Sequence, residues 1–241
     1  MWQNIVRNSV LPDYDARVDV SRARGPKRHY HVDPESIARA ALAIIDTHGL
    51  EALNLRDLAK SLGVGTSTLY EFVSGRDDIV MQLTGLLLDE IDTTDMPGES
   101  WDETVRRVMH SVNEMALRHP MAFELVALAP ENREPMLTHL RRLEQLFAVR
   151  GLSAPVFTQI WSVLDAFVTG FALLETKAIK LAKGDEVDGR EVASPRVPAT
   201  EVWSTCSFGR DLEVVIAGLR QTYIRDQATE RRNRDRQNPE V

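Results

Sequence analysis

Cysteine is nearly absent from this chain of 241 residues, which contains only Cys206. One cysteine cannot form an intramolecular disulfide, so folding does not depend on an oxidising compartment. Long apolar runs are also missing, since no uninterrupted stretch reaches the ~20 residues needed to cross a bilayer. Polar side chains break up residues 1–12, where a signal peptide would be apolar. These absences predict a soluble protein of the cytoplasm.

Motifs of catalysis are missing as well. There is no glycine-rich phosphate loop, no cysteine pair for zinc and no nucleophile elbow. The chain has six histidines, and no two of them stand four residues apart on an expected helix. His29 and His31 are the nearest pair, and they lie in a leader without helical periodicity. The sequence therefore predicts a protein that is not an enzyme and that holds neither a metal ion nor an organic cofactor.

The formal net charge of −7 at first disfavours a nucleic-acid partner. The distribution of charge matters more than its sum. Between positions 20 and 32 every formally charged side chain is basic: Arg22, Arg24, Lys27 and Arg28. This basic segment precedes the first expected helix, where a flexible arm can reach phosphates or a minor groove. A solvated leader without a partner is the alternative.

Apolar residues recur at helical spacing along most of the chain, and no alternating strand pattern is present. We therefore expect an all-α fold. The helices are expected at residues 34–48, 54–62, 66–72, 76–91, 101–118, 120–128, 134–150, 154–181 and 208–223. Polar segments with proline or glycine predict loops at 93–100 and 183–200.

Two of these helices are short and are joined by a tight turn that contains glycine. Asn54 is the expected N-cap of the first, Gly63 ends it after about two turns, and Thr66 begins the second. Short helices joined in this way are typical of a helix-turn-helix. Neither helix is long enough to be stable alone, so both must pack against the preceding helix at 34–48.

Residues 33–225 resemble the tetracycline-repressor (TetR) family of transcription regulators. In the head, the resemblance is carried by residues 38–42, 49–53, 55–64 and 66–73. In the body it is carried by His119-Pro120 and by residues 170–175 and 208–212, which are similar to the C-terminal domain of the tetracycline-repressor branch. The resemblance implies an N-terminal three-helix helix-turn-helix head and a C-terminal helical body that binds ligand and dimerises.

The implied domains follow from this plan. Residues 1–32 form a flexible basic arm, and residues 33–78 form the helix-turn-helix DNA-binding domain. Residues 79–226 form the effector-binding and dimerisation domain, and residues 227–241 form a charged tail.

The resemblance also implies roles on DNA for single residues. Tyr70 matches a tyrosine whose hydroxyl contacts a backbone phosphate, and Arg56 matches a position that can contact a guanine. Arg76 can bind a phosphate together with the N-terminus of its helix. Glu71 is repelled by phosphates unless it accepts from cytosine N4 or pairs with Arg76. The full set of expected DNA-binding residues is Asn54, Arg56, Gly65, Thr66, Ser67, Thr68, Tyr70, Glu71 and Arg76.

The expected helix at 154–181 is apolar around nearly its whole circumference, so it must be enclosed on every side. We expect it to face its own core on one side and a second subunit on the other. The predicted homodimer pairs the helices near 154–181 and 208–223 with their copies.

The family resemblance further implies a cavity in each body for a small-molecule effector. Asp165 and Thr169 are polar positions one turn apart on an otherwise apolar helix, and buried polar groups need partners. Polar contacts within the core or across the dimer are the alternative. A site for a ligand-bound metal is not predicted. The expected cavity walls are Trp101, His110, Asn113, Phe123, Met136, Phe147, Trp161, Asp165 and Thr169.

The function implied by the resemblance is that of a ligand-responsive repressor. As a homodimer it would bind a near-palindromic operator in double-stranded DNA, and a small-molecule effector would release it. Two alternatives remain at this point. One is a helix-turn-helix regulator without a small-molecule effector, and the other is a helical enzyme or carrier that does not use its helix-turn-helix.

Overall fold

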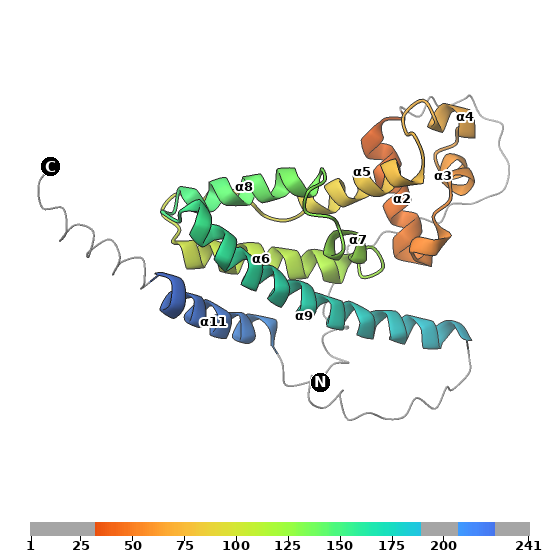
Figure 1. Ribbon diagram of the computed structural model, residues 1–241. Coiled ribbons are helices and arrows are strands. Elements are labelled where there is room, and N and C mark those ends of the chain that lie inside the picture. Colours follow the sequence, from red (N-terminus) through yellow and green to blue (C-terminus); the bar gives the residue numbers. More distant parts are fainter. Residues whose placement is uncertain (1–31, 189–206, 225–241) are drawn as a thin grey trace, which may run out of the picture.

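The computed structural model describes residues 32–188 and 207–224. The expected basic arm and charged tail lie outside this part of the chain, and so does the segment 189–206. Within the described residues the regular structure is entirely helical (Figure 1), which confirms the predicted all-α fold. The elements are α2 (Pro34–His48), η1 (Leu50–Ala52), α3 (Leu55–Ser61), α4 (Thr66–Leu69), α5 (Arg76–Asp89), α6 (Trp101–Arg118), α7 (Glu124–Ala127), α8 (Met136–Ala148), α9 (Ala154–Asp188), α11 (Phe208–Leu219) and η2 (Arg220–Ile224).

Helix α2 begins and ends where its sequence predicts. The Asp33 carboxylate accepts a hydrogen bond from the Ser36 backbone amide at 2.7 Å, and the Ser36 hydroxyl oxygen accepts from the Asp33 amide at 3.0 Å. This reciprocal pair satisfies two amides at the start of the helix. Gly49 ends α2 with a φ of 85°, a conformation that favours glycine.

Helices α2, α3 and α4 form a small group at one end of the molecule, and α5 leads from this group into the body (Figure 1). Helix α2 packs against both α3 and α5. Ile37 and Ile45 of α2, Leu58 of α3, Leu69 of α4 and Leu83 of α5 are all fully buried. The short helices are therefore stabilised by packing rather than by their own length.

The body consists of α6, α8, α9 and α11, with the one-turn helix α7 between α5 and α9. Helix α9 packs against α6, α8 and α11, and α5 packs against α7 and α8. In Figure 1, α9 and α11 lie side by side on the face of the body away from α5 and α8. One continuous apolar core runs from α2 to α11.

The connection between α5 and α6 is held by charged side chains. Arg107 of α6 donates to the backbone carbonyls of Asp92 and Thr94 at 3.0 and 2.8 Å, and it pairs with the Glu99 carboxylate at 2.7 Å. Hydrogen bonding from Arg107 lowers the pKa of Glu99. The predicted loop at 93–100 is thus non-helical and firmly attached to the body.

Four of the expected helices differ clearly from those in the structure, and α5 and α8 end within two residues of their expected bounds. Helix α4 ends at Leu69 rather than Phe72, because the chain continues in turns with hydrogen bonds to residues three positions back. Helix α7 covers only four of the residues expected at 120–128. Helix α9 continues to Asp188 through the polar residues expected to form a loop from position 183, and α11 ends at Leu219 before a π turn.

Helix α9 is unusual in its length and apolar character. Its segment Ala154–Leu181 is long and apolar enough to cross a membrane by those two criteria alone. The core helix of a folded domain passes the same test, and α9 packs against α6, α7, α8 and α11. Part of its apolar surface stays exposed in the single chain, including Leu174 and Leu181.

Candidate nucleic-acid interface and internal pocket

The first short helix of the predicted helix-turn-helix is capped as expected. The Asn54 side-chain oxygen accepts from the Asp57 backbone amide at 2.9 Å, and the Asn54 side-chain nitrogen donates to the Asp57 carboxylate at 2.7 Å. Asn54 therefore fixes the start of α3, although the sequence also placed it among the DNA contacts. Arg56 follows on the exposed surface of α3. Its guanidinium makes no hydrogen bond or ion pair with the residues that the structure describes.

The second short helix presents a polar surface above a buried anchor. Gly65 is the N-cap of α4, and Thr66 and Ser67 are exposed while Leu69 is fully buried. Thr68 is partly exposed. The side chain of Tyr70 follows at once and is 54% exposed. Helix α4, which carries the hydroxyls of Thr66, Ser67 and Thr68, lies at the end of the molecule away from α11 (Figure 1).

Arg76 and Glu71 do not pair with each other. Arg76 donates to the backbone carbonyl of Leu50 at 3.1 Å, which ties the start of α5 to the turn after α2. Glu71 is exposed, and no ion pair joins it to a cation among the described residues. One of the two expected explanations for a carboxylate near DNA, a salt bridge with Arg76, is therefore absent from this structure.

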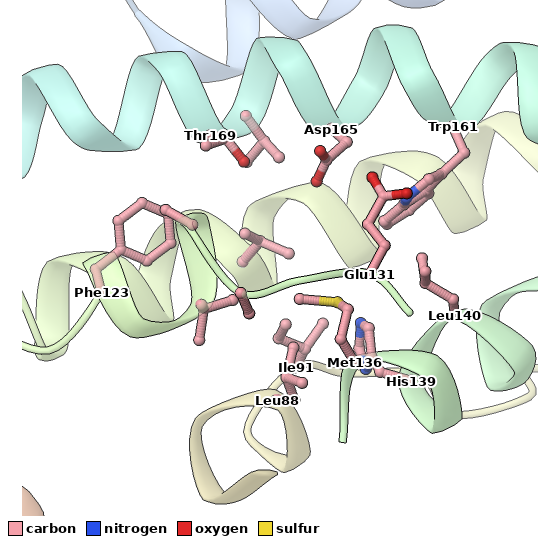
Figure 2. A pocket seen from close by; sticks show the side chains of 15 residues that line it. Leu88, Ile91, Phe123, Glu131, Met136, His139, Leu140, Trp161, Asp165 and Thr169 are labelled. Carbon is pink, nitrogen blue, oxygen red and sulfur yellow. The ribbon is translucent and has the colours of Figure 1, made fainter. Parts of the chain in front are cut away.

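A pocket lies inside the body, lined by residues of α5, α6, α7, α8 and α9 and of the loops that follow α5 and α7 (Figure 2). Its cavity volume is about 90 Å³, which is room for several water molecules or for part of a larger ligand. Five of the nine expected wall residues line it: Phe123, Met136, Trp161, Asp165 and Thr169. Leu88 of α5 and Ile91, two residues beyond the end of that helix, also line it.

The other four expected wall residues lie elsewhere. His110 is exposed, and its ring meets Phe208 of α11 edge-on at 5.2 Å between centroids. Trp101 lies under the guanidinium of Arg220, which is 5.9 Å from its ring centroid. Phe147 packs in the core 5.7 Å from the ring of Phe157, and Asn113 is buried on α6 near Glu175. Residue type and helical period do not distinguish the wall of a cavity from a packed core or from a contact between helices.

Two polar residues of the pocket were missed by the sequence analysis. His139 of α8 is only 4% exposed, and its Nδ1 atom has no hydrogen-bond partner. Glu131 lies in the loop between α7 and α8, and its side chain reaches the same pocket. Position 139 lies on the buried face of its helix, but a single histidine on such a face does not by itself indicate a cavity.

Burial shifts the proton equilibria of this pocket. Desolvation, with a smaller effect from Arg142, lowers the pKa of His139 from 6.5 to about 4. Desolvation also raises the pKa of Asp165, and the charge of Glu131 adds to that increase. His139 is therefore neutral at neutral pH, and the Asp165 carboxyl group loses its proton at a higher pH than an ordinary aspartate does.

The pKa of His139 leads to a stability prediction. The folded state binds this proton less tightly than the unfolded state, so the stabilisation is complete above pH 6.5 and is lost as the pH falls towards 4. The full shift corresponds to about 3 kcal/mol at 1.36 kcal/mol per pKa unit. Urea unfolding of the wild type and of His139→Leu across this range should show the wild type losing more stability. Parallel pH profiles for the two proteins would contradict it.

A charged cluster joins the head to the body. His119, the C-cap of α6, lies 2.7 Å from the Asp46 carboxylate of α2 through Nδ1 and 3.1 Å from Glu90 through Nε2. Arg118 pairs with the same Glu90 at 2.9 Å. Hydrogen bonding to Asp46 raises the pKa of His119, so the protonated form strengthens this junction. His119 thus connects the end of α6 to α2 and to Glu90, the C-cap of α5.

A helix-turn-helix with exposed hydroxyls on a helical body with an internal pocket defines the class of a DNA-binding transcription regulator. Comparison with known proteins identifies the particular family. Residues 37–83 match the family model described as bacterial regulatory proteins, tetR family, and residues 94–223 match the tetracyclin repressor-like, C-terminal domain. The chain belongs to the TetR family of bacterial transcription regulators.

Relatives and solved structures agree with this assignment. The chain is 26% identical over 216 residues to the HTH-type transcriptional repressor DrrR1 of Streptomyces coeruleorubidus, a match that covers 83% of this chain and 78% of that protein. The structure of ActR from Streptomyces coelicolor without ligand has a TM-score of 0.58 and 27% identity, covering 78% of this chain and 94% of ActR. TetR from Acinetobacter baumannii shares the fold, with a TM-score of 0.62, 18% identity and coverage of 80% and 98%. These relatives are regulators and not enzymes, which confirms that prediction for this chain.

Proposed function

We propose that this protein is a ligand-responsive repressor of the cytoplasm that binds a near-palindromic operator as a homodimer. The observation that carries the proposal is the position of the pocket. Leu88 of α5 and Ile91, which follows that helix, line it together with Asp165 and Thr169 of α9. Since α5 also packs on α2, an occupant of the pocket contacts the helix that supports the DNA-binding head.

Ligands bound to a relative support a small-molecule effector. ActR has been solved in complex with (S)-DNPA and in complex with actinorhodin, and these structures have TM-scores of 0.59 and 0.58 against this chain. Their sequence identities are 25% and 26%. An occupied pocket that favours a different position of α5 would shift the population of heads away from the spacing that DNA requires. The partnerless Nδ1 atom of His139 in this cavity favours a regulator with an effector over one without.

The outer face of α9 and α11 supports the homodimer. Leu174 and Leu181 on α9 are 48% and 60% exposed, and Val214 on α11 is 70% exposed. Gly170 and Gly218 border open space, where a partner helix can approach closely. An apolar face with small residues is what two long helices need to pack against their copies. This pairing would also cover the apolar surface that makes α9 resemble a membrane helix.

Tyr70, Arg76 and the hydroxyls of α4 are proposed to position the head on phosphates and base edges, while Arg56 contacts a guanine. Replacing Arg56 with alanine should weaken operator binding by about 1–3 kcal/mol and relax the preference at one base pair of each half-site. Selection from random duplexes by wild type and variant checks this. Arg39→Ala is the matched control, because Arg39 is an exposed arginine of α2 that pairs with Glu35.

The wild type should select a near-palindromic sequence, and the control variant should select the same one. An equal loss on all sequences would make Arg56 a phosphate contact instead. Recovery of no preferred duplex by the wild type would overturn the proposed function.

The cluster around His119 is proposed to transmit the effector signal. Asp46→Asn should leave operator binding without effector nearly unchanged, yet weaken the release caused by effector. Residues in such a connection change coupling by about 0.5–2 kcal/mol, which is roughly 2-fold to 30-fold. Operator titrations with and without effector measure this, with Glu35→Gln on the outer surface of α2 as the control. Equal release in Asp46→Asn and wild type would show that the cluster plays no part.

A further inference from the structure

The pocket contains two carboxylates without a balancing cation. Asp165 is partly buried on α9, and Glu131 approaches it from the loop between α7 and α8, closely enough for its charge to raise the pKa of Asp165. Among the described residues no lysine or arginine forms an ion pair with either carboxylate. Figure 2 shows both carboxylates directed into the space beside the indole of Trp161. Glu131 is exposed, but burial of Asp165 and the charge of Glu131 both disfavour the Asp165 anion, and a hydrogen bond with Thr169 offsets this only in part, so a positive group bound between the two carboxylates would be stabilised.

A second polar group faces the same space without a partner. His139 is only 4% exposed, and the Nδ1 atom of its imidazole makes no hydrogen bond. In Figure 2 it lies on the wall opposite Asp165. A buried polar atom without a partner is rare in folded proteins and costs free energy. This cost is recovered when a ligand supplies the missing contact.

The remaining wall is aromatic and adaptable. Trp161 and Phe123 offer ring faces, which bind both apolar bodies and cations. Met136 also lines the cavity, and its flexible thioether can move aside for a ligand that is larger than the present space. An anionic ligand would be repelled by the two carboxylates at close range.

We propose that the effector is an aromatic compound that carries a basic amine. Its ammonium group binds between Asp165 and Glu131, its ring lies against Trp161, and a polar substituent reaches Nδ1 of His139. This inference rests on the proposed function, since it assigns a ligand class to the proposed effector pocket. It goes further by predicting which charge the ligand must carry.

The experiment uses three probes with one ring system and different charge: 9-(aminomethyl)anthracene, 9-anthracenemethanol and anthracene-9-acetic acid. Binding to the full-length protein is measured by fluorescence titration at pH 7, and release of operator DNA is measured with the same probes. A hydrogen bond to a charged group contributes about 1.5–3 kcal/mol, so the amine should bind roughly 10-fold to 100-fold more tightly than the alcohol. The acid should bind more weakly than the alcohol.

The variants separate the charge from the cavity. Asp165→Asn and Glu131→Gln should each reduce the preference for amine over alcohol at least several-fold, while the affinity for the alcohol stays nearly constant. Glu144→Gln removes an exposed carboxylate of α8 outside the pocket and should leave the preference intact.

Each outcome decides one of the two claims. Equal binding of amine and alcohol, or an unchanged preference in Asp165→Asn, overturns the amine and leaves the effector pocket in place. Failure of all three probes to bind contradicts both claims about the pocket, while operator binding in the same assay still reports on the DNA-binding role.

Discussion

Replacing Val214 with glutamate should convert the protein into a monomer and lower its affinity for operator DNA by about a hundredfold. Val214 is 70% exposed on α11, beside the apolar outer face of α9. In a symmetric dimer the substitution places two carboxylates in one apolar interface, where burial of unpaired charge is costly. Two linked heads bind two half-sites far more tightly than one head binds either, so loss of the dimer removes this gain.

Analytical ultracentrifugation and gel shifts on the same protein preparation test this prediction. Val149→Glu is the control, because Val149 is 68% exposed at the end of α8 and lies outside the proposed interface. The control should remain dimeric with unchanged affinity for DNA. A Val214→Glu protein that is still dimeric, or a monomer that binds the operator at full strength, would contradict the proposed interface.

The second large effect is expected from filling the pocket. Ala127 of α7 lines the cavity and is partly exposed, so Ala127→Phe places a ring in the space that an effector needs. We expect effector affinity to fall by about a hundredfold or more, since overpacking and lost contacts together cost several kcal/mol. Operator binding should remain, which would give a repressor that no longer responds.

Titration of the operator complex with effector measures this response. Ala148→Phe adds the same ring at an exposed position of α8 outside the pocket and should respond like the wild type. A normal response in Ala127→Phe would place the effector somewhere else in the molecule. Loss of operator binding in Ala127→Phe would instead show that the ring itself forces the released conformation.

Most of the fold could be predicted from local signals. Asp33 and Asn54 cap the helices that they were expected to cap, and Gly49 takes the positive φ that ends α2. Helix ends without such signals were predicted less well. Helix α9 runs on through polar residues after position 181, because backbone hydrogen bonding can extend a helix where no apolar period marks it.

The pocket could be predicted only in part. Asp165 and Thr169 stood out because they interrupt an apolar helix, and both line the cavity. His110 and Phe147 have equally suitable residue types, but one lies against α11 and the other packs in the core. His139 and Glu131 reach the pocket from elements far along the chain, and only the tertiary packing brings them towards Asp165.

The candidate DNA-contact surface could also be predicted only in part. The sequence placed Arg56, Thr66, Ser67 and Tyr70 on short helices, and their side chains are exposed as DNA contacts require. The contact of Arg76 with the carbonyl of Leu50 was not foreseen, because it joins residues 26 positions apart. Local patterns predict which element a residue occupies, whereas long-range contacts decide what its side chain does.

A nuclease footprint on the DNA upstream of the protein's own gene tests the central claim most directly. The dimeric protein should protect two half-sites of one near-palindrome, centred about 34–36 Å apart. Protection should weaken steeply with added salt, because basic side chains displace counterions from the phosphates, and it should disappear when effector is added. A protein that protects no promoter DNA even at low salt would contradict the account.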